Sequence, residues 1–186
     1  RYKGKVITII GHKTDPGVDI LSIAYKYGIL EKFPDEVNEE IENIPTEVKK
    51  SELKNRVDLT AEQIFTIDGD DTKDIDDAIS LEMDKDDYIL GVHIADVSYY
   101  VKKDTPLGNE AFKRGTSSYL ADTVIPMLPR KLSNGICSLN PNEVRLTLSC
   151  EMRIDKKGNI LDTKIFESYI KSNIQMTYKK VNDLLM

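Results

Sequence analysis

The pattern of hydrophobic and polar positions predicts helices in the first third of the chain. Residues 5–10, KVITII, are rich in β-branched side chains and predict one short strand with no partner nearby in the sequence. Residues 15–28 open with Asp-Pro, place apolar residues at helical spacing and end in Gly, which predicts a short helix. Residues 34–44 predict a second helix that ends before a proline. We therefore expect a helical connector over residues 12–57.

From about residue 58 the pattern changes to strands with irregular loops. Residues 78–83 and 88–95 predict two strands joined by a polar turn. Residues 144–154 and 159–170, separated by Asp-Lys-Lys-Gly, predict the clearest β-hairpin of the chain. Together with the helices, these hairpins predict an α+β fold.

Two segments of the second half lack a strand pattern. Residues 106–116 are mildly helical, and residues 125–141 hold three prolines and one glycine, which predicts loops and short turns. At the end of the chain, an apolar helical stripe that begins near Val181 has barely completed a turn at Met186. Because the first residue is Arg1 and not methionine, we expect the chain to be a piece of a longer protein.

Composition and cysteine content indicate a cellular compartment. The 186-residue chain is 40% hydrophobic and 31% charged, as globular proteins are. No apolar run approaches the roughly 18 to 20 residues that cross a bilayer. Cys137 and Cys150 have no companions at zinc-ligand spacing, which favours reduced thiols over a metal site or a disulfide. We expect a soluble, cytoplasmic protein with no membrane partner and no obligate protein partner.

The distribution of charge points to a substrate that carries phosphate. The net charge of −6 would by itself disfavour a nucleic-acid partner. However, residues 61–96 carry 12 acidic and 2 basic side chains, whereas residues 97–186 carry 14 basic and 9 acidic ones. An acidic centre loaded with metal beside a basic surface suits a phosphodiester. The alternative is that the acidic block is only a solvated face.

The acidity is concentrated in the stretch FTIDGDDTKDIDDAIS, residues 65–80. Six of the ten residues from Asp68 to Asp77 are aspartates. Carboxylates this close repel one another unless a cation lies among them, and oxygen ligands suit Mg²⁺. An EF-hand starting at Asp68 would need Gly and Glu where Lys73 and Ile79 stand, so structural calcium is disfavoured.

Spacing selects four of these aspartates as a candidate metal and catalytic site. Gly69 lets the backbone bend back after the first aspartate, and Asp74 and Asp77 are expected to share one face of a turn. Asp70 and Asp71 are expected to be exposed loop residues. The four candidates are Asp68, Asp74, Asp76 and Asp77. About four carboxylates are enough for two-metal phosphoryl chemistry, while structural metal binding and simple solvation remain open alternatives.

Four further patterns stand in order along the chain: IDGDDTKDIDDAIS, VHIADVSYYV, RGTSSYL and IPMLPRKLSNGICSLNP. Together these four blocks resemble the catalytic domain of the ribonuclease II and ribonuclease R family of bacterial exoribonucleases. The amino-acid sequences of the second and fourth blocks are more similar to the ribonuclease R branch. The resemblance implies that residues 58–186 are the N-terminal part of the catalytic (RNB) domain. It also implies that residues 1–11 are the last strand of a preceding cold-shock-type domain.

The resemblance implies a magnesium-dependent, processive 3′→5′ exoribonuclease that hydrolyses single-stranded or structured RNA to nucleoside 5′-monophosphates, with Mn²⁺ as a possible substitute ion. Asp68 and Asp77 would be metal ligands, Asp74 and Asp76 would act in catalysis as well as in metal binding, and Tyr119 would stack on the base at the 3′ end. Because later parts of the domain are absent, the isolated piece is expected to be inactive or weak. The competing hypotheses are an RNA-binding module with a structural divalent cation and a scaffold fragment that binds neither.

Other conspicuous residues receive structural roles. His93 lies in an alternating strand and is expected to pack in the core, and Tyr99 and Tyr100 are expected to brace the fold. For three basic residues, phosphate contact and solvated surface remain equally open. These are Arg114, Arg130 and Lys131.

Overall fold

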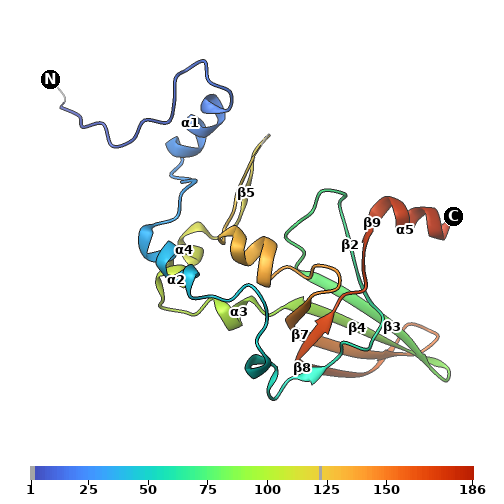
Figure 1. The fold of residues 1–186 in the computed structure, drawn as a ribbon. Coiled ribbons are helices and arrows are strands. Elements are labelled where there is room, and N and C mark those ends of the chain that lie inside the picture. Colours follow the sequence, from blue (N-terminus) through green and yellow to red (C-terminus); the bar gives the residue numbers. More distant parts are fainter. Residues whose placement is uncertain (1–2, 122) are drawn as a thin grey trace.

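A seven-stranded sheet forms the strand-rich part of the molecule (Figure 1). In the computed structural model, which describes residues 3–121 and 123–186, its order is β1-β8-β7-β4-β3-β2-β9. The strands are β1 (Val57–Asp58), β2 (Ile64–Asp68), β3 (Asp77–Asp84), β4 (Asp87–Ala95), β7 (Val144–Ile154), β8 (Ile160–Lys171) and β9 (Ile174–Thr177). The pairs β1–β8 and β2–β9 are parallel, and the other pairs are antiparallel.

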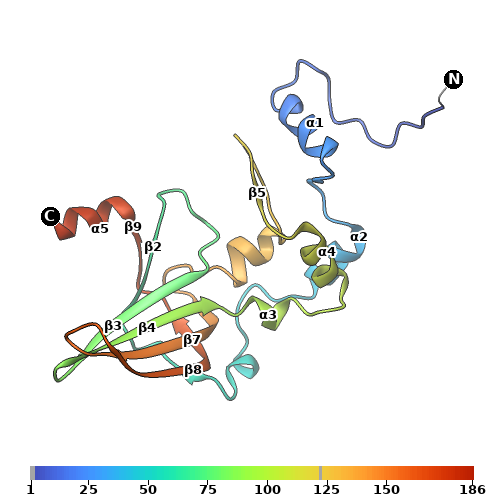
Figure 2. The same cartoon turned by 180° about the vertical axis from the view of Figure 1, so that it is seen from behind.

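Both predicted hairpins are confirmed, as β3–β4 and β7–β8, and they lie side by side in the middle of the sheet (Figure 2). A separate two-stranded hairpin consists of β5 (Ser118–Tyr119) and β6 (Val124–Ile125). With the helices described next, the predicted α+β class is confirmed.

Helices cover one end of the sheet and form the connector. They are α1 (Val18–Lys26), α2 (Asp35–Glu42), η1 (Lys50–Leu53), α3 (Val97–Tyr100), α4 (Pro106–Arg114), η2 (Leu132–Ile136) and α5 (Tyr178–Leu185). The two predicted connector helices are confirmed as α1 and α2. After α1, Gly28 has φ 76°, and the N–H of Ile29 donates to the carbonyl of Ala24 at 2.9 Å. Glycine at this position therefore ends α1 as predicted.

The strand predicted at residues 5–10 is wrong. Val6, Ile7 and Ile9 are exposed, because no other part of the described chain lies beside them to pair with their backbone. Residues 125–141 were predicted to be largely loop and short turns, and most of them are. They also contain η2, a short helical segment that is irregular at Gly135 and buries Leu132 and Ile136, which lie four residues apart.

The core has two clusters of buried residues. The first joins α2, α4 and η2, and the second lies against the sheet. The members of the second cluster are Leu59, Ile64, Ile75, Ala78, Ala95, Leu139 and Ile170. This second cluster matters for function because Ile75 belongs to the aspartate-rich loop.

No helix in the described part of the chain is long and apolar enough to cross a bilayer. Cys137 and Cys150 are free thiols, as predicted. Tyr100 is buried, and its ring meets that of Tyr99 edge to face at 5.0 Å, which agrees with a bracing role.

His93 packs inside the sheet, as predicted, with 2% of its surface exposed. Its Nδ1 is joined to Ser149 Oγ by a hydrogen bond of 2.7 Å, and its Nε2 to Ser80 Oγ by one of 3.1 Å. Burial lowers the pKa of His93 from 6.5 to about 4. The imidazole is therefore neutral in the folded chain at neutral pH.

Acid should destabilise the fold through His93. Between pH 6.5 and about 4 the unfolded chain binds a proton on this histidine that the folded chain does not, so stability is lost as pH falls. The full loss is about 3 kcal/mol. Urea unfolding between pH 7 and 4 should show that His93→Gln loses less stability than the unmodified chain. The control His12→Gln, whose side chain is exposed, should lose as much stability as the unmodified chain. Equal pH dependence of His93→Gln and the unmodified chain would contradict the assignment.

Candidate active site

The aspartate-rich loop connects two neighbouring antiparallel strands of the sheet. Asp68 is the last residue of β2 and Asp77 the first of β3, so both lie at the same end of the sheet. Between them, the N–H of Thr72 donates to the carbonyl of Gly69 at 3.2 Å and closes a turn, as the glycine predicted. Asp70 and Asp71 lie on this turn and are exposed, which confirms that prediction.

The second half of the loop is extended and pinned to the core. Ile75 is buried, with 1% exposed, and its N–H donates to Ser138 Oγ at 3.1 Å. The Ser138 hydroxyl in turn donates to the carbonyl of Lys73 at 2.8 Å. The N–H of Leu139 donates to the carbonyl of Ile75 at 2.8 Å. These three bonds fix the backbone on both sides of Ile75.

Because the backbone is extended here, Asp74 and Asp76 share the side opposite to Ile75. Both line a pocket of about 300 Å³. The expectation that Asp74 and Asp77 share a face of a turn was wrong, since the core contacts of Ile75 hold this segment straight.

Tyr119 reaches the same pocket from β5. Its hydroxyl donates to Asp74 Oδ2 at 3.1 Å, and 69% of the residue is exposed. The hydrogen bond to Asp74 raises the pKa of the Tyr119 hydroxyl, because the bond requires the protonated form. An exposed aromatic ring thus lies beside two of the four candidate aspartates.

Asp68 carries an unsatisfied oxygen. Among the described residues, its Oδ2 is buried without a hydrogen-bond partner, and so is the Thr66 Oγ1. Burial raises the pKa of Asp68, the Thr66 hydroxyl partly offsets this, and repulsion from Asp77, Asp76 and Asp74 adds to the rise. Such an atom is costly unless a donor or a cation faces it.

Asp76 is exposed to solvent, yet its pKa is also raised. Partial loss of hydration is the first cause, and repulsion from Asp77 and Asp74 follows. The carboxylates therefore interact unfavourably with one another, as the sequence suggested.

The donor chemistry fits a hard divalent cation, although the ligands do not converge. Oxygen donors, an unpartnered buried oxygen on Asp68 and mutual repulsion are all features that such an ion would relieve. In residues 3–121 and 123–186, however, no group of three or more His, Cys, Asp or Glu side chains is close enough to hold a metal ion. The metal-binding role of the four aspartates stays a prediction.

Two of the three basic candidates serve the fold. Arg114 donates to Glu110 Oε1 at 2.9 Å, and its guanidinium lies 3.8 Å from the centre of the Phe33 ring. Lys131 Nζ donates to the carbonyl of Ile41 at 2.7 Å, near the end of α2. Only Arg130 is exposed, and it lines a second pocket of about 510 Å³ together with Tyr119 and several loop residues.

The sequence of this chain matches two known protein families. Residues 56–186 match the RNB domain family, and residues 1–34 match the cold shock domain family. The chain belongs to the RNB domain family. The resemblance noted in the sequence is therefore confirmed. The division into residues 1–11, 12–57 and 58–186 stays a prediction.

The RNB relatives are much longer than this chain. Ribonuclease R of Thermotoga maritima is 50% identical over 186 residues, which cover 98% of this chain and 26% of that protein. A structure of Mycoplasma genitalium RNase R with ribose-methylated single-stranded RNA has a TM-score of 0.88 at 33% identity, covering 95% of this chain and 28% of that one. The same enzyme with double-stranded RNA gives 0.89 at 33% identity, covering 95% and 31%. This chain thus spans about a quarter of the Thermotoga protein.

Ser138 was missed in the sequence, although it lies inside the fourth block that carries the family resemblance. Its small polar side chain stands between apolar neighbours, which could have signalled a buried hydrogen-bonding role. Its partners in the RNB domain lie more than 60 residues earlier in the chain.

Removing the Ser138 hydroxyl should destabilise the RNB domain. Ser138→Ala leaves the buried N–H of Ile75 without its acceptor, which costs about 1 to 3 kcal/mol. The matched control is Ser133→Ala, because Ser133 is partly buried and its hydroxyl, among the described residues, bonds only to the neighbouring Asn134 side chain. Its expected change lies within about 0.5 kcal/mol. Denaturant unfolding of both variants measures the difference, and equal stabilities would refute the pinning role of Ser138.

Proposed function

We propose that this chain is the N-terminal part of the catalytic domain of a magnesium-dependent, processive 3′→5′ exoribonuclease. The parent protein would hydrolyse RNA to nucleoside 5′-monophosphates during RNA turnover in the cytoplasm. Membership of the RNB family and similarity to proteins named ribonuclease R support this. The observation that carries it is the pocket lined by Asp74, Asp76 and Tyr119, which joins carboxylates to an exposed aromatic ring.

Four carboxylates would hold the divalent ions, and Mn²⁺ could replace Mg²⁺. They are Asp68, Asp74, Asp76 and Asp77. The unpartnered Oδ2 of Asp68 supports its role as a ligand. When bound, the ions supply positive charge against the scissile phosphate and activate water for attack.

The chain's own residues would orient the RNA end. Asp76 is the residue expected to be indispensable for hydrolysis, because it lines the pocket and is repelled by the neighbouring Asp77 and Asp74. Tyr119 would stack on the terminal base. Stacking tolerates every base, which suits an enzyme that must remove each nucleotide in turn.

The RNA partner would be single-stranded or structured. The solved M. genitalium structures, one with single-stranded and one with double-stranded RNA, support both. Arg130, exposed beside the loop, is a candidate phosphate contact.

Asp76→Asn in the full-length parent should reduce hydrolysis to less than about one thousandth of the unmodified rate and leave RNA affinity within about twofold. The substitution removes one negative charge and keeps the side-chain shape, so substrate binding should persist. End-labelled RNA with magnesium measures stepwise loss from the 3′ end, and filter binding in EDTA measures affinity.

The matched control is Asp70→Asn, an aspartate on the exposed turn of the same loop that is not among the four candidates. It should keep more than about half of the activity. If Asp76→Asn degrades RNA as fast as the unmodified enzyme, the assignment fails. If the unmodified protein binds RNA but never degrades it with Mg²⁺ or Mn²⁺, the chain belongs to an RNA-binding module instead.

Tyr119 should act through its ring and not through its hydroxyl. Tyr119→Ala is expected to weaken binding of the RNA 3′ end by about 1 to 3 kcal/mol, whereas Tyr119→Phe, which loses only the bond to Asp74, should stay within about threefold of the unmodified affinity. Fluorescence anisotropy with short RNAs separates the two. Equal loss in both variants would assign the role to the hydroxyl.

A further inference from the structure

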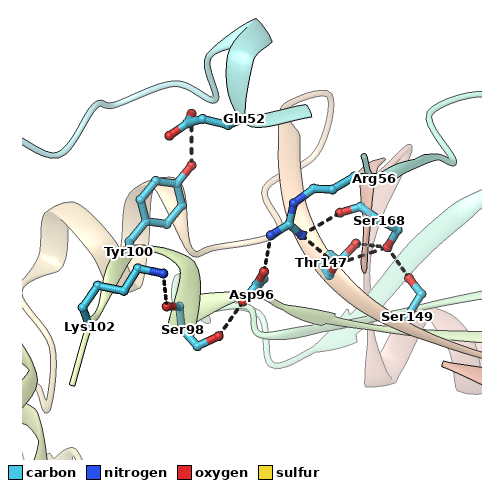
Figure 3. A network of polar contacts seen from close by, with 9 residues as sticks. All are labelled: Glu52, Arg56, Asp96, Ser98, Tyr100, Lys102, Thr147, Ser149 and Ser168. Carbon is cyan, nitrogen blue, oxygen red and sulfur yellow. Dashed lines mark hydrogen bonds and ion pairs between the residues drawn. The ribbon is translucent and has the colours of Figure 1, made fainter. Parts of the chain in front are cut away.

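Arg56 lies at the end of the connector and binds the part of the sheet formed by β7 and β8, which lies away from β2. It follows η1 and precedes β1, and only 4% of its side chain is exposed. Its guanidinium donates to the carbonyls of Thr147 and Ser168 at 3.2 and 3.3 Å, and to Asp96 Oδ2 at 2.5 Å (Figure 3). One side chain thus binds three groups from β7, β8 and the residue after β4.

Both carboxylate oxygens and the backbone N–H of Asp96 form hydrogen bonds. Besides the bond from Arg56, its Oδ1 accepts a hydrogen bond from the Ser98 hydroxyl at 2.8 Å (Figure 3). Its own N–H donates to the carbonyl of Leu146 at 2.9 Å. Burial raises the pKa of this carboxyl, but the bonds from Arg56 and Ser98 and the guanidinium charge outweigh it, so the net pKa lies below the ordinary value. Only 10% of the side chain is exposed, and the ion pair is complete.

Two of the three groups that Arg56 binds, the carbonyls of Thr147 and Ser168, belong to one row of the sheet that ends at the aspartate-rich loop. Val57 pairs with Ser168, Ser168 with Thr147, and Thr147 with Ala95. At the end of this row, the N–H of Ala95 donates to the carbonyl of Asp76 at 2.9 Å. Arg56 therefore braces the row from β1 to Ala95, and the next backbone in that row carries Asp76.

We propose that Arg56 is a positioning residue for Asp76: through Thr147, Ser168 and Asp96 it fixes the end of β4 that holds the Asp76 backbone. This inference rests on the proposed function, because it assigns Asp76 a role in hydrolysis. Arg56 itself lines neither of the two pockets at the aspartate loop. It acts only through the sheet.

The chemistry of the pair explains why arginine stands here. A planar guanidinium reaches two carbonyls and a carboxylate at once, which a lysine ammonium does less well. Removing Arg56 leaves the buried carboxylate of Asp96 without its partner, and that carboxylate must then turn toward water or take up a proton. Either change weakens the contacts that fix Asp96, the residue after Ala95. A small displacement of a group beside the reacting phosphate is enough to slow catalysis strongly.

The test uses the full-length parent protein. Arg56→Gln is expected to lower kcat for RNA hydrolysis about tenfold to a hundredfold and to leave KM within about twofold. Arg56→Lys, which keeps a positive charge opposite Asp96, should recover part of kcat. In the double variant Arg56→Gln with Asp96→Asn no buried charge stays unpaired, so its kcat should be no lower than that of Arg56→Gln alone.

Arg153 supplies the matched control. It also forms an ion pair between strands, with Asp84 and Asp87, but this pair lies at the turn of the β3–β4 hairpin and is partly exposed. Arg153→Gln should leave kcat and KM within about twofold of the unmodified enzyme. A kcat for Arg56→Gln equal to that of Arg153→Gln would overturn the inference.

Hydrogen exchange tests the same link without activity. The amide of Ala95, which bonds to Asp76, should exchange at least about tenfold faster in Arg56→Gln than in the unmodified protein and should not change in Arg153→Gln. Unchanged exchange at Ala95 would overturn the inference even if kcat fell. If the unmodified protein shows no metal-dependent hydrolysis but Ala95 exchange responds to Arg56, the proposed function fails and the link between Arg56 and the Asp76 backbone stands.

Discussion

Repulsion among the carboxylates of the loop between β2 and β3 is the constraint that the surrounding structure has to meet. A flexible loop would let the aspartates move apart. Here Asp68 and Asp77 are the end residues of paired strands, and buried Ile75 holds the segment between them. The loop backbone is held in place, and burial first and then repulsion from the neighbouring carboxylates raise the pKa values of Asp68 and Asp76. The fold thus stores the unfavourable interaction that a bound cation would relieve.

Several basic side chains after residue 97 bind other groups within the fold. Arg114 donates to the carbonyl of Pro126 and Lys131 to that of Ile41 in α2. Arg145 is buried, with its Nε bonded to the carbonyl of Ser138. Arg153 pairs with two aspartates. The number of basic side chains in this region is therefore larger than the number available to bind RNA phosphates. Basic residues that are paired within the fold should not be counted as part of a binding surface.

Sequence periodicity was enough for elements whose partners are local. The hairpins β3–β4 and β7–β8 and the helices α1 and α2 followed from alternation, turn residues and caps. The four aspartates were also chosen by spacing, and their metal-binding role stays a prediction. The strand predicted at residues 5–10 failed because a strand exists only with a partner. The paired orientation of Asp74 and Asp77 failed because Ser138, 63 residues away from Ile75, straightens the loop. No local pattern could indicate Arg56, whose contacts reach residues 40 to 112 positions later.

The two sides of the pocket differ in how firmly they are held, and this difference suits the proposed reaction. Asp74 and Asp76 flank a buried residue in the loop that joins β2 and β3 at one end of the seven-stranded sheet. Tyr119 lies on a hairpin of two-residue strands that projects from the body of the molecule in both views (Figures 1 and 2). So short a hairpin is marginally stable by itself. In the proposed reaction, a fixed carboxylate side would define where the phosphate lies, and a yielding aromatic side would accept each new base as the RNA advances. The single hydrogen bond from Tyr119 to Asp74 joins the two sides.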